Sequence, residues 1–255
     1  MIRVTSLALI LTLALAAGCG KSQPDGAATF QVAAAADLAL AFAEIGKAFE
    51  AKHHVKPVFS FGSTGLLAKQ IGEGAPFSLF AAANEAFAKE VAAKGKCDGA
   101  TVRRYARGRI VVWTPASVTA PTSLADLADA RFKRIAIANP EHAPYGKAAK
   151  KALQSVGLWD QLQPRLVLGE NVRATLQFAQ TGNVDVAIIA LSLAQTADGG
   201  ATLAIDQALY DPLEQALVVC GTGKQAELGR QLGDYILSDE GQEVLTRYGF
   251  APPAP

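Results

Sequence analysis

The chain has 255 residues, half of them hydrophobic, and its 24 Lys and Arg balance 23 Asp and Glu to a formal charge of +1. It has no basic stripe and no basic residues interleaved with aromatic ones, so nucleic acid is not expected as a partner. Three histidines are too few to indicate a metal centre, and neither a bound metal cation nor a cofactor is expected.

The first residues are typical of a secretory signal rather than of a fold. Arg3 is followed by an apolar run, 7–17, which is short for a membrane span, and small residues precede Cys19. The ending resembles a bacterial lipoprotein signal, in which the cysteine becomes lipidated. We predict a signal over 1–19 with Cys19 as the lipidation site, and a polar tether over 20–28. The alternative is ordinary cleavage, which leaves Cys19 as a free thiol.

From residue 29 onward, short apolar runs alternate with amphipathic segments. Strands are expected at 29–36, 55–62, 77–83, 108–115, 134–140, 165–171, 185–192 and 214–221. Helices are expected at 37–53, from Thr64, at 85–95, 145–160 and 172–182, and as one long helix over 226–250. The end, 251–255, is Pro-rich and is predicted to be disordered. This alternation indicates an α/β fold with mostly parallel sheets covered by helices on both faces.

Two segments, 105–115 and 210–219, are candidates for a hinge. A chain that leaves one lobe at the first segment and returns at the second has two lobes joined by two crossings. We predict one lobe from 29–108 plus 218–250 and the other from 109–217.

Small or polar residues stand where predicted strands end and helices begin. In parallel sheets, ligands bind at such junctions. A helix start that exposes N–H groups beside a hydroxyl is an anion site, although Ser or Thr there is often only a cap. The stretch "FGSTG" at 61–65 has this pattern.

Several stretches together resemble the periplasmic molybdate-binding proteins, the solute receptors of ABC importers. They include "FSFGSTGLLAKQIGEGAPF", "LFAAANEAF", "ANPEHAPYGKAA" and "LGENVRATLQFAQTGNVDVAIIALS", in order along nearly the whole chain after the signal. The resemblance implies the type II two-lobed fold of periplasmic binding proteins, with lobes that close over molybdate or tungstate. It also implies an ABC permease as partner, a monomer, and a location in the periplasm or cell envelope, with membrane contact through the lipid anchor only.

The resemblance further implies which residues surround the oxyanion: Asp37, Thr64 and Ala83 from one lobe, and Tyr145, Val172 and Gln215 from the other. Ala83, Val172 and Tyr145 would bind through backbone N–H groups, Thr64 through its hydroxyl and N–H, and Gln215 through its side-chain amide. Less direct candidates for ligand binding are Ser63, Asn84 and Asn171. Of these, Ser63 is expected to be a helix cap.

Asp37 departs from the family pattern, in which this position is often serine. A carboxylate close to a dianion is unfavourable. Three alternatives remain: Asp37 caps its own helix and offers only its N–H, Asp37 is protonated when ligand is bound, or the ligand is a different oxyanion or small solute.

A secreted enzyme is not supported, because no nucleophile–base motif, G-x-S-x-G elbow or H-E-x-x-H motif occurs in the sequence. Cys97 and Cys220 could pair in an oxidising compartment or remain two buried thiols, and the sequence leaves both open.

Overall fold

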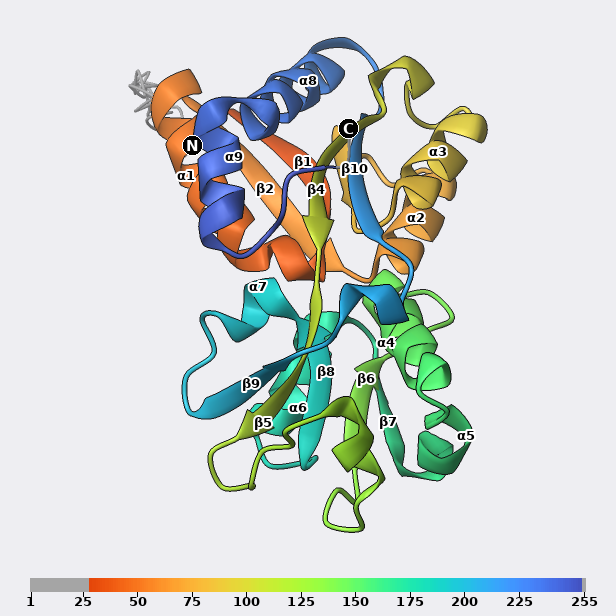
Figure 1. Cartoon of the computed structure of the whole chain (residues 1–255). Coiled ribbons are helices and arrows are strands. Elements are labelled where there is room, and N and C mark those ends of the chain that lie inside the picture. The colour runs from red at the N-terminus through yellow and green to blue at the C-terminus, as the bar shows by residue number, and fades with distance from the viewer. Residues whose placement is uncertain (1–27, 254–255) are drawn as a thin grey trace, which may run out of the picture.

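A computed structural model describes residues 28–253 of the chain. The predicted signal, Cys19 and the tether up to residue 27 lie outside the described residues. Two five-stranded sheets, each flanked by helices, form two lobes stacked one above the other (Figure 1). The predicted two-lobed α/β architecture is confirmed.

The first lobe holds the beginning and the end of the described chain. Its elements are β1 (Ala28–Ala35), η1 (Ala36–Leu38), α1 (Ala39–His53), β2 (Val55–Gly62), α2 (Thr64–Gly72), β3 (Leu79–Ala82), α3 (Glu85–Ala93), η2 (Gly99–Thr101), β4 (Arg103–Gly108), β10 (Leu213–Val219), α8 (Gly223–Leu237) and α9 (Asp239–Arg247). Its strand order is β2-β1-β3-β10-β4.

The second lobe is continuous in sequence. Its elements are β5 (Ile110–Pro115), η3 (Leu124–Ala128), β6 (Ile135–Ala138), α4 (Pro144–Ser155), α5 (Trp159–Leu162), η4 (Gln163–Arg165), β7 (Leu166–Gly169), α6 (Val172–Gln180), β8 (Val186–Ala190), α7 (Leu191–Ala194), β9 (Gly200–Ala204) and η5 (Gln207–Leu209). Its strand order is β7-β6-β8-β5-β9.

Strand register brings several helix starts to one edge of the first sheet. β1 pairs in parallel with β2 so that Ala35 lies opposite Gly62, and it pairs in parallel with β3 so that Ala34 lies opposite Ala81. The segments that follow these strands therefore leave the sheet side by side, facing the second lobe. In each sheet a single strand, β10 or β5, runs against the others.

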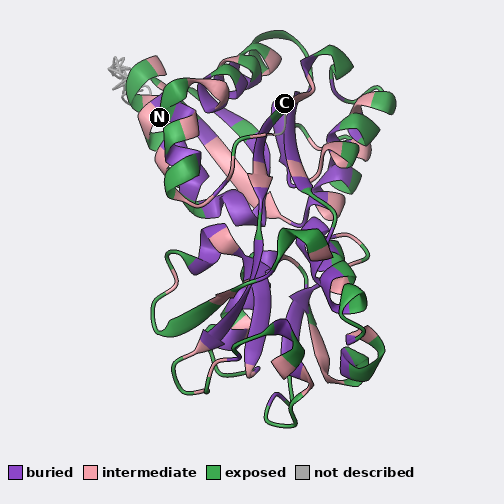
Figure 2. Cartoon of the chain, in the orientation of Figure 1, coloured by how far each residue is buried: buried purple, intermediate pink, exposed green. Residues whose placement is uncertain are grey.

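Both faces of the central strands β3 and β10 of the first sheet are buried, which explains why their sequences are mostly apolar. Val32 and Ala34 pack in the core shared with α1, α8 and α9, whereas Ala33 packs with Leu67 of α2 and neighbouring residues of α3. Figure 2 shows the buried strands in the middle of each lobe, with exposed residues on the outer helices and loops. Within residues 28–253 no helix is long and apolar enough to cross a membrane.

The two crossings lie at the junction of β4 and β5 and between β9 and β10 (Figure 1). β10 pairs with β3 and β4 along its length, so residues 213–217 lie in the first lobe and not in the second, as the predicted boundary had them. The strands β4 and β9 were not predicted as such, because "RRYARG" is highly charged and "GATLA" is largely exposed.

The predicted single final helix is wrong. Ser238 has an extended backbone that ends α8, and its hydroxyl accepts a hydrogen bond from the Gly241 N–H as the cap of α9. The predicted disordered tail is also wrong at its start, because Ala251 exchanges two backbone hydrogen bonds with Arg107. Residues 254–255 lie outside the described residues.

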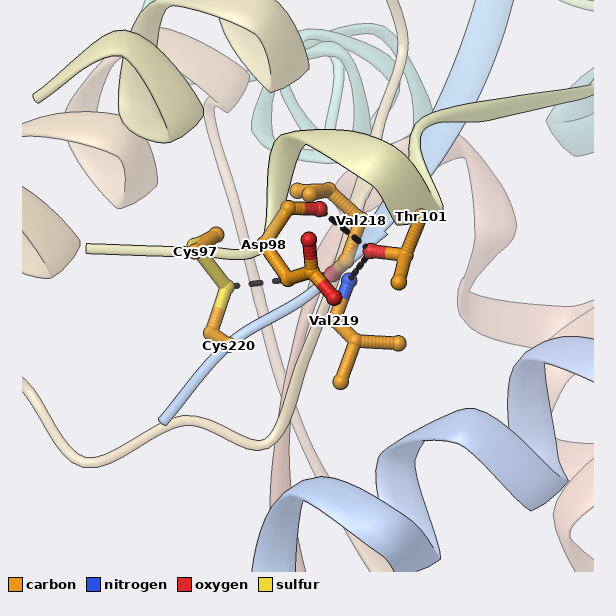
Figure 3. The surroundings of a disulfide bond; sticks show 6 residues. All are labelled: Cys97, Asp98, Thr101, Val218, Val219 and Cys220. Carbon is orange, nitrogen blue, oxygen red and sulfur yellow. Dashed lines mark hydrogen bonds between the residues drawn. A yellow bond between two sulfur atoms is a disulfide. The ribbon is translucent and has the colours of Figure 1, made fainter. Parts of the chain in front are cut away.

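Cys97 and Cys220 form a disulfide, which answers the question that the sequence left open (Figure 3). It joins the segment after α3 to the end of β10, across 123 residues of sequence. Next to it, the Thr101 hydroxyl donates to the Asp98 carbonyl and accepts from the Val219 N–H. A disulfide of this kind is typical of an oxidising compartment.

Candidate functional site

A small cavity of about 10 Å³ lies between the lobes, where the strands of both sheets end. Its walls include five of the six residues predicted to surround the ligand: Asp37, Thr64, Ala83, Tyr145 and Val172. Ser63 and Asn171 line it as well. The structure therefore brings these distant junctions together around one cavity.

The start of α6 directs one backbone donor to the cavity. The Asn171 side-chain oxygen accepts hydrogen bonds from the N–H groups of Arg173 and Ala174, at 3.1 and 3.0 Å. Asn171 is thus the cap of α6, and Val172 is the first residue of the helix, whose N–H has no partner within the helix. Because Val172 itself lines the cavity, this N–H is available to an anion there.

The start of α2 places a hydroxyl at the cavity. Thr64 is 1% exposed, and its Oγ1 accepts a hydrogen bond from the Ala83 N–H at 3.2 Å. The N–H predicted to bind the ligand directly is therefore engaged with Thr64 in this conformation. Since a hydroxyl can accept and donate at once, Thr64 still has its own proton to offer.

Ser63 links the two lobes and does not cap α2. It occupies the N-cap position, but its side chain makes no cap hydrogen bond. Instead its Oγ donates to the His142 carbonyl at 2.9 Å and lies 2.8 Å from His142 Nδ1. The Gly65 N–H donates to the same carbonyl at 2.9 Å. The prediction of Ser63 as a cap is wrong because a partner from the other lobe takes its hydroxyl.

Asp37 joins both lobes through its carboxylate. Its Oδ2 accepts from Tyr145 Oη at 2.8 Å and from Gln215 Nε2 at 2.6 Å, while Gln215 Nε2 also lies 3.0 Å from Tyr145 Oη. Behind them, Tyr105 Oη donates to Gln215 Oε1 at 2.7 Å. The Ser192 hydroxyl donates to the backbone carbonyl of Asp37 at 2.9 Å.

This arrangement excludes a cap role for the Asp37 side chain, because Oδ2 is bonded to Tyr145 and Gln215 and Oδ1 has no hydrogen-bond partner among the described residues. Asp37 is 1% exposed, and burial raises the pKa of its carboxyl from 3.8 to about 6, although the hydrogen bonds from Gln215 and Tyr145 partly oppose the shift. Burial also raises the pKa of Tyr145 well above its usual value, as does the neighbouring carboxylate, so that its hydroxyl stays a donor.

Two predicted residues do not reach the cavity. Gln215 lies behind Asp37 and Tyr145 and holds them in place instead of lining the wall. Asn84 caps α3, accepting from the Ala86 N–H at 2.8 Å, and borders a separate groove beside α4.

Three residues with direct contacts to the site were not among the candidates. His142 stands in the "NPEHAPYG" stretch, two residues before the start of α4, so the motif could have indicated it. Tyr105 and Ser192 carry no local signal, because only the tertiary structure brings them to Gln215 and Asp37. Within residues 28–253, no group of three His, Cys, Asp or Glu residues could hold a metal ion.

Comparison with known proteins agrees with the two-lobed fold described above. A family model described as bacterial extracellular solute-binding protein matches residues 30–251. The chain belongs to this family. It is thus an extracellular solute-binding protein of the bacterial type rather than an enzyme.

Individual relatives resemble the chain over nearly its whole length. The chain is 32% identical to the molybdate-binding protein ModA of Rhodobacter capsulatus over 96% of its own length and 94% of that protein. It is 30% identical to YvgL of Bacillus subtilis, named a putative ABC transporter substrate-binding lipoprotein, over 96% of each chain.

A solved structure shares the fold. The periplasmic molybdate-binding protein of Azotobacter vinelandii superposes with a TM-score of 0.82 at 24% identity, covering 88% of this chain and 100% of that one. The match extends over both lobes, as expected for a common two-lobed architecture.

Proposed function

We propose that this solute-binding protein captures molybdate or tungstate between its lobes and delivers it to an ABC permease. The observation that carries the proposal is the convergence of helix starts from both lobes on one buried cavity, lined by Thr64, Tyr145 and Val172. The relatives named as molybdate-binding proteins support the choice of ligand. The groups around the cavity are neutral donors, apart from Asp37, and suit a tetrahedral oxyanion.

Binding requires the lobes to separate and close again. A cavity of about 10 Å³ is near the lower limit for a single water molecule, so an anion with four oxygens enters only when the lobes move apart. The crossings beside β4 and β10 are the natural hinges. Six charge-assisted hydrogen bonds of about 1.5–3 kcal/mol each give about 9–18 kcal/mol, which exceeds the roughly 8 kcal/mol of a micromolar complex before the costs of closure and immobilisation are subtracted.

Cys19 is proposed as the lipid anchor that keeps the protein near its permease. The B. subtilis relative, named a lipoprotein, supports this assignment. The test is mass spectrometry of the chain purified from the bacterial envelope. A diacylglyceryl adduct on Cys19 is expected, and an unmodified N-terminus downstream of Cys19 would contradict it.

The test of the ligand is calorimetric titration of the host-processed chain with sodium molybdate, tungstate and sulfate. Micromolar or tighter binding of molybdate and tungstate, with much weaker binding of sulfate, is expected because the pocket selects by radius among ions of equal charge and shape. Absence of binding by molybdate and tungstate would refute the proposal and favour a receptor for another oxyanion or a small solute.

A further inference from the structure

Asp37 has one carboxylate oxygen without a partner. Its Oδ2 accepts two hydrogen bonds, whereas Oδ1 is buried and has no hydrogen-bond partner among the described residues. Asp37 also lines the cavity between the lobes. An ionised carboxylate oxygen that is buried without a donor is unfavourable, so this oxygen needs either a proton or a donor from a ligand.

The two side chains that donate to Oδ2 cannot also supply Oδ1, because their protons are in use. Gln215 directs one N–H to Asp37 and the other to Tyr145, and the Tyr145 hydroxyl donates to Asp37 Oδ2. The Tyr105 hydroxyl donates to Gln215 Oε1 and thereby fixes which side of the amide faces Asp37. A proton bound by Asp37 therefore goes to Oδ1, which becomes an O–H donor.

Among residues 28–253, no cation contacts Asp37 to keep it ionised. The titratable groups in contact with its network are the neutral hydroxyls of Tyr145 on α4 and Tyr105 on β4, and α7 has no charged residue. Charged residues on the elements packed around η1 and Gln215 have other partners or are exposed. Glu44 of α1 pairs with Arg247, Arg104 of β4 pairs with Glu85, and Glu214 of β10 lies near Arg107. Lys56 of β2, Lys147 of α4 and Arg173 of α6 are exposed. Burial accordingly raises the pKa of Asp37.

We propose that Asp37 takes part in the bound complex as a neutral carboxylic acid that shares its Oδ1 proton with a ligand oxygen, so that capture of a fully ionised tetrahedral oxyanion takes up one proton. The inference rests on the proposed function of this same cavity. The proton comes from solvent, since the free dianion carries none at pH 8. The complex written with the proton on the ligand and Asp37 ionised has the same proton count. Either form removes the repulsion between a carboxylate and a dianion.

The decisive experiment is titration of the host-processed chain with sodium molybdate at pH 6, 7 and 8, in pairs of buffers with different ionisation enthalpies. The dependence of the observed heat on the buffer gives the number of protons taken up. We expect a value close to one at pH 8 and an affinity that falls towards tenfold per pH unit above pH 7.

The variant Asp37→Asn supplies a hydrogen-bond donor at this position without a titrating proton. Its amide supplies a permanent N–H in place of the Oδ1 proton and keeps an oxygen for Tyr145 and Gln215. This variant is expected to bind molybdate with no proton uptake and to bind more tightly than the natural chain at pH 8. The matched control is Asp160→Asn, at an exposed position on α5, which is expected to keep both the uptake and the pH dependence.

The outcomes also separate this inference from the proposed function. Tight molybdate binding by the natural chain without proton uptake and without pH dependence would overturn the role of Asp37 while leaving the receptor intact. No binding of molybdate by the natural chain or by Asp37→Asn at any pH would overturn the receptor, and the inference with it. The measurement on the natural chain decides the question even if the variant does not fold.

Discussion

Gly65 lies where the two lobes touch, and an added methyl group there tests whether closure is needed for binding. A Cβ built on Gly65 would lie 2.6 Å from the His142 carbonyl oxygen and 3.1 Å from its Cα, both backbone atoms of the opposite lobe. Real Cβ atoms do not approach backbone this closely, so Gly65→Ala must push the lobes apart at this point. The Gly65 N–H also loses its bond to His142.

The expected loss of affinity follows from these two contacts. Overpacking against backbone costs roughly 1–3 kcal/mol, and one net hydrogen bond contributes about 0.5–1.5 kcal/mol. Together about 2–4 kcal/mol are lost from the closed state, which corresponds to roughly 30- to 1000-fold weaker binding. In the open state alanine is acceptable in α2 and favours the helix by about 0.5–1 kcal/mol, so thermal stability should not fall.

Calorimetry with molybdate measures the loss of affinity, and small-angle scattering with and without molybdate measures whether the lobes close. Gly65→Ala is expected to bind weakly and to remain extended when molybdate is added. Gly72→Ala is the matched control, because it lies in the same helix and a Cβ there meets nothing within 4 Å. Binding by Gly65→Ala within threefold of the natural chain would refute the reasoning, since the contact with His142 would then be absent from the bound state.

Three further predictions concern the cap, the disulfide and the buried acid. Asn171→Ala removes the acceptor of two N–H groups at the start of α6 and should cost about 1 kcal/mol of stability and weaken molybdate binding; denaturant unfolding and calorimetry measure both, and Asn171→Asp, which keeps the acceptor, should restore the stability. Replacing Cys97 and Cys220 by serine opens a loop of about 120 residues and should lower the free energy of unfolding by about 2–5 kcal/mol, with little effect on affinity in the folded protein; an unchanged urea midpoint would contradict this. The pKa of Asp37 is about 6 in the folded state against an ordinary 3.8, so the folded state binds more protons between these two pH values. The free energy of unfolding should therefore fall by about 3 kcal/mol as the pH rises through this window. Denaturant unfolding should show Asp37→Asn to be more stable than the natural chain at pH 7.5, with no difference below pH 4.

Local patterns were sufficient to predict most of the fold. Strand 55–62 was predicted with its observed bounds, and the helices at Thr64 and Val172 begin where predicted, because apolar periodicity and a following helix signal coincide there. The strand β4 and the break at Ser238 escaped prediction. β4 is a strand because it pairs with β10, and Ser238 interrupts a run of residues that otherwise favours one helix.

The residues around the candidate site could be predicted from the sequence, but the hydrogen bonds between them could not. The resemblance indicated Asp37, Thr64 and Tyr145 as neighbours, and the structure brings them to one cavity. That Gln215 holds Asp37 instead of facing the cavity depends on Tyr105, whose position is set by the sheet. Hydrogen-bond partners of this kind depend on the tertiary structure, and no local sequence pattern predicts them.

The groups that join the lobes are adjacent to the groups that we propose to face the ligand, and this arrangement would couple ligand binding to lobe closure. Tyr145 bonds Asp37 across the lobes, and His142 meets Ser63 two positions from the start of α4. A ligand shifts the equilibrium towards closure only by contacts that it gains in the closed state. An oxyanion bonded to Thr64 from one lobe and to Val172 from the other has such contacts, because neither lobe alone supplies both. The existing contacts at Asp37 and Ser63 reduce the additional free energy that the ligand must supply, so a small anion suffices to close two lobes.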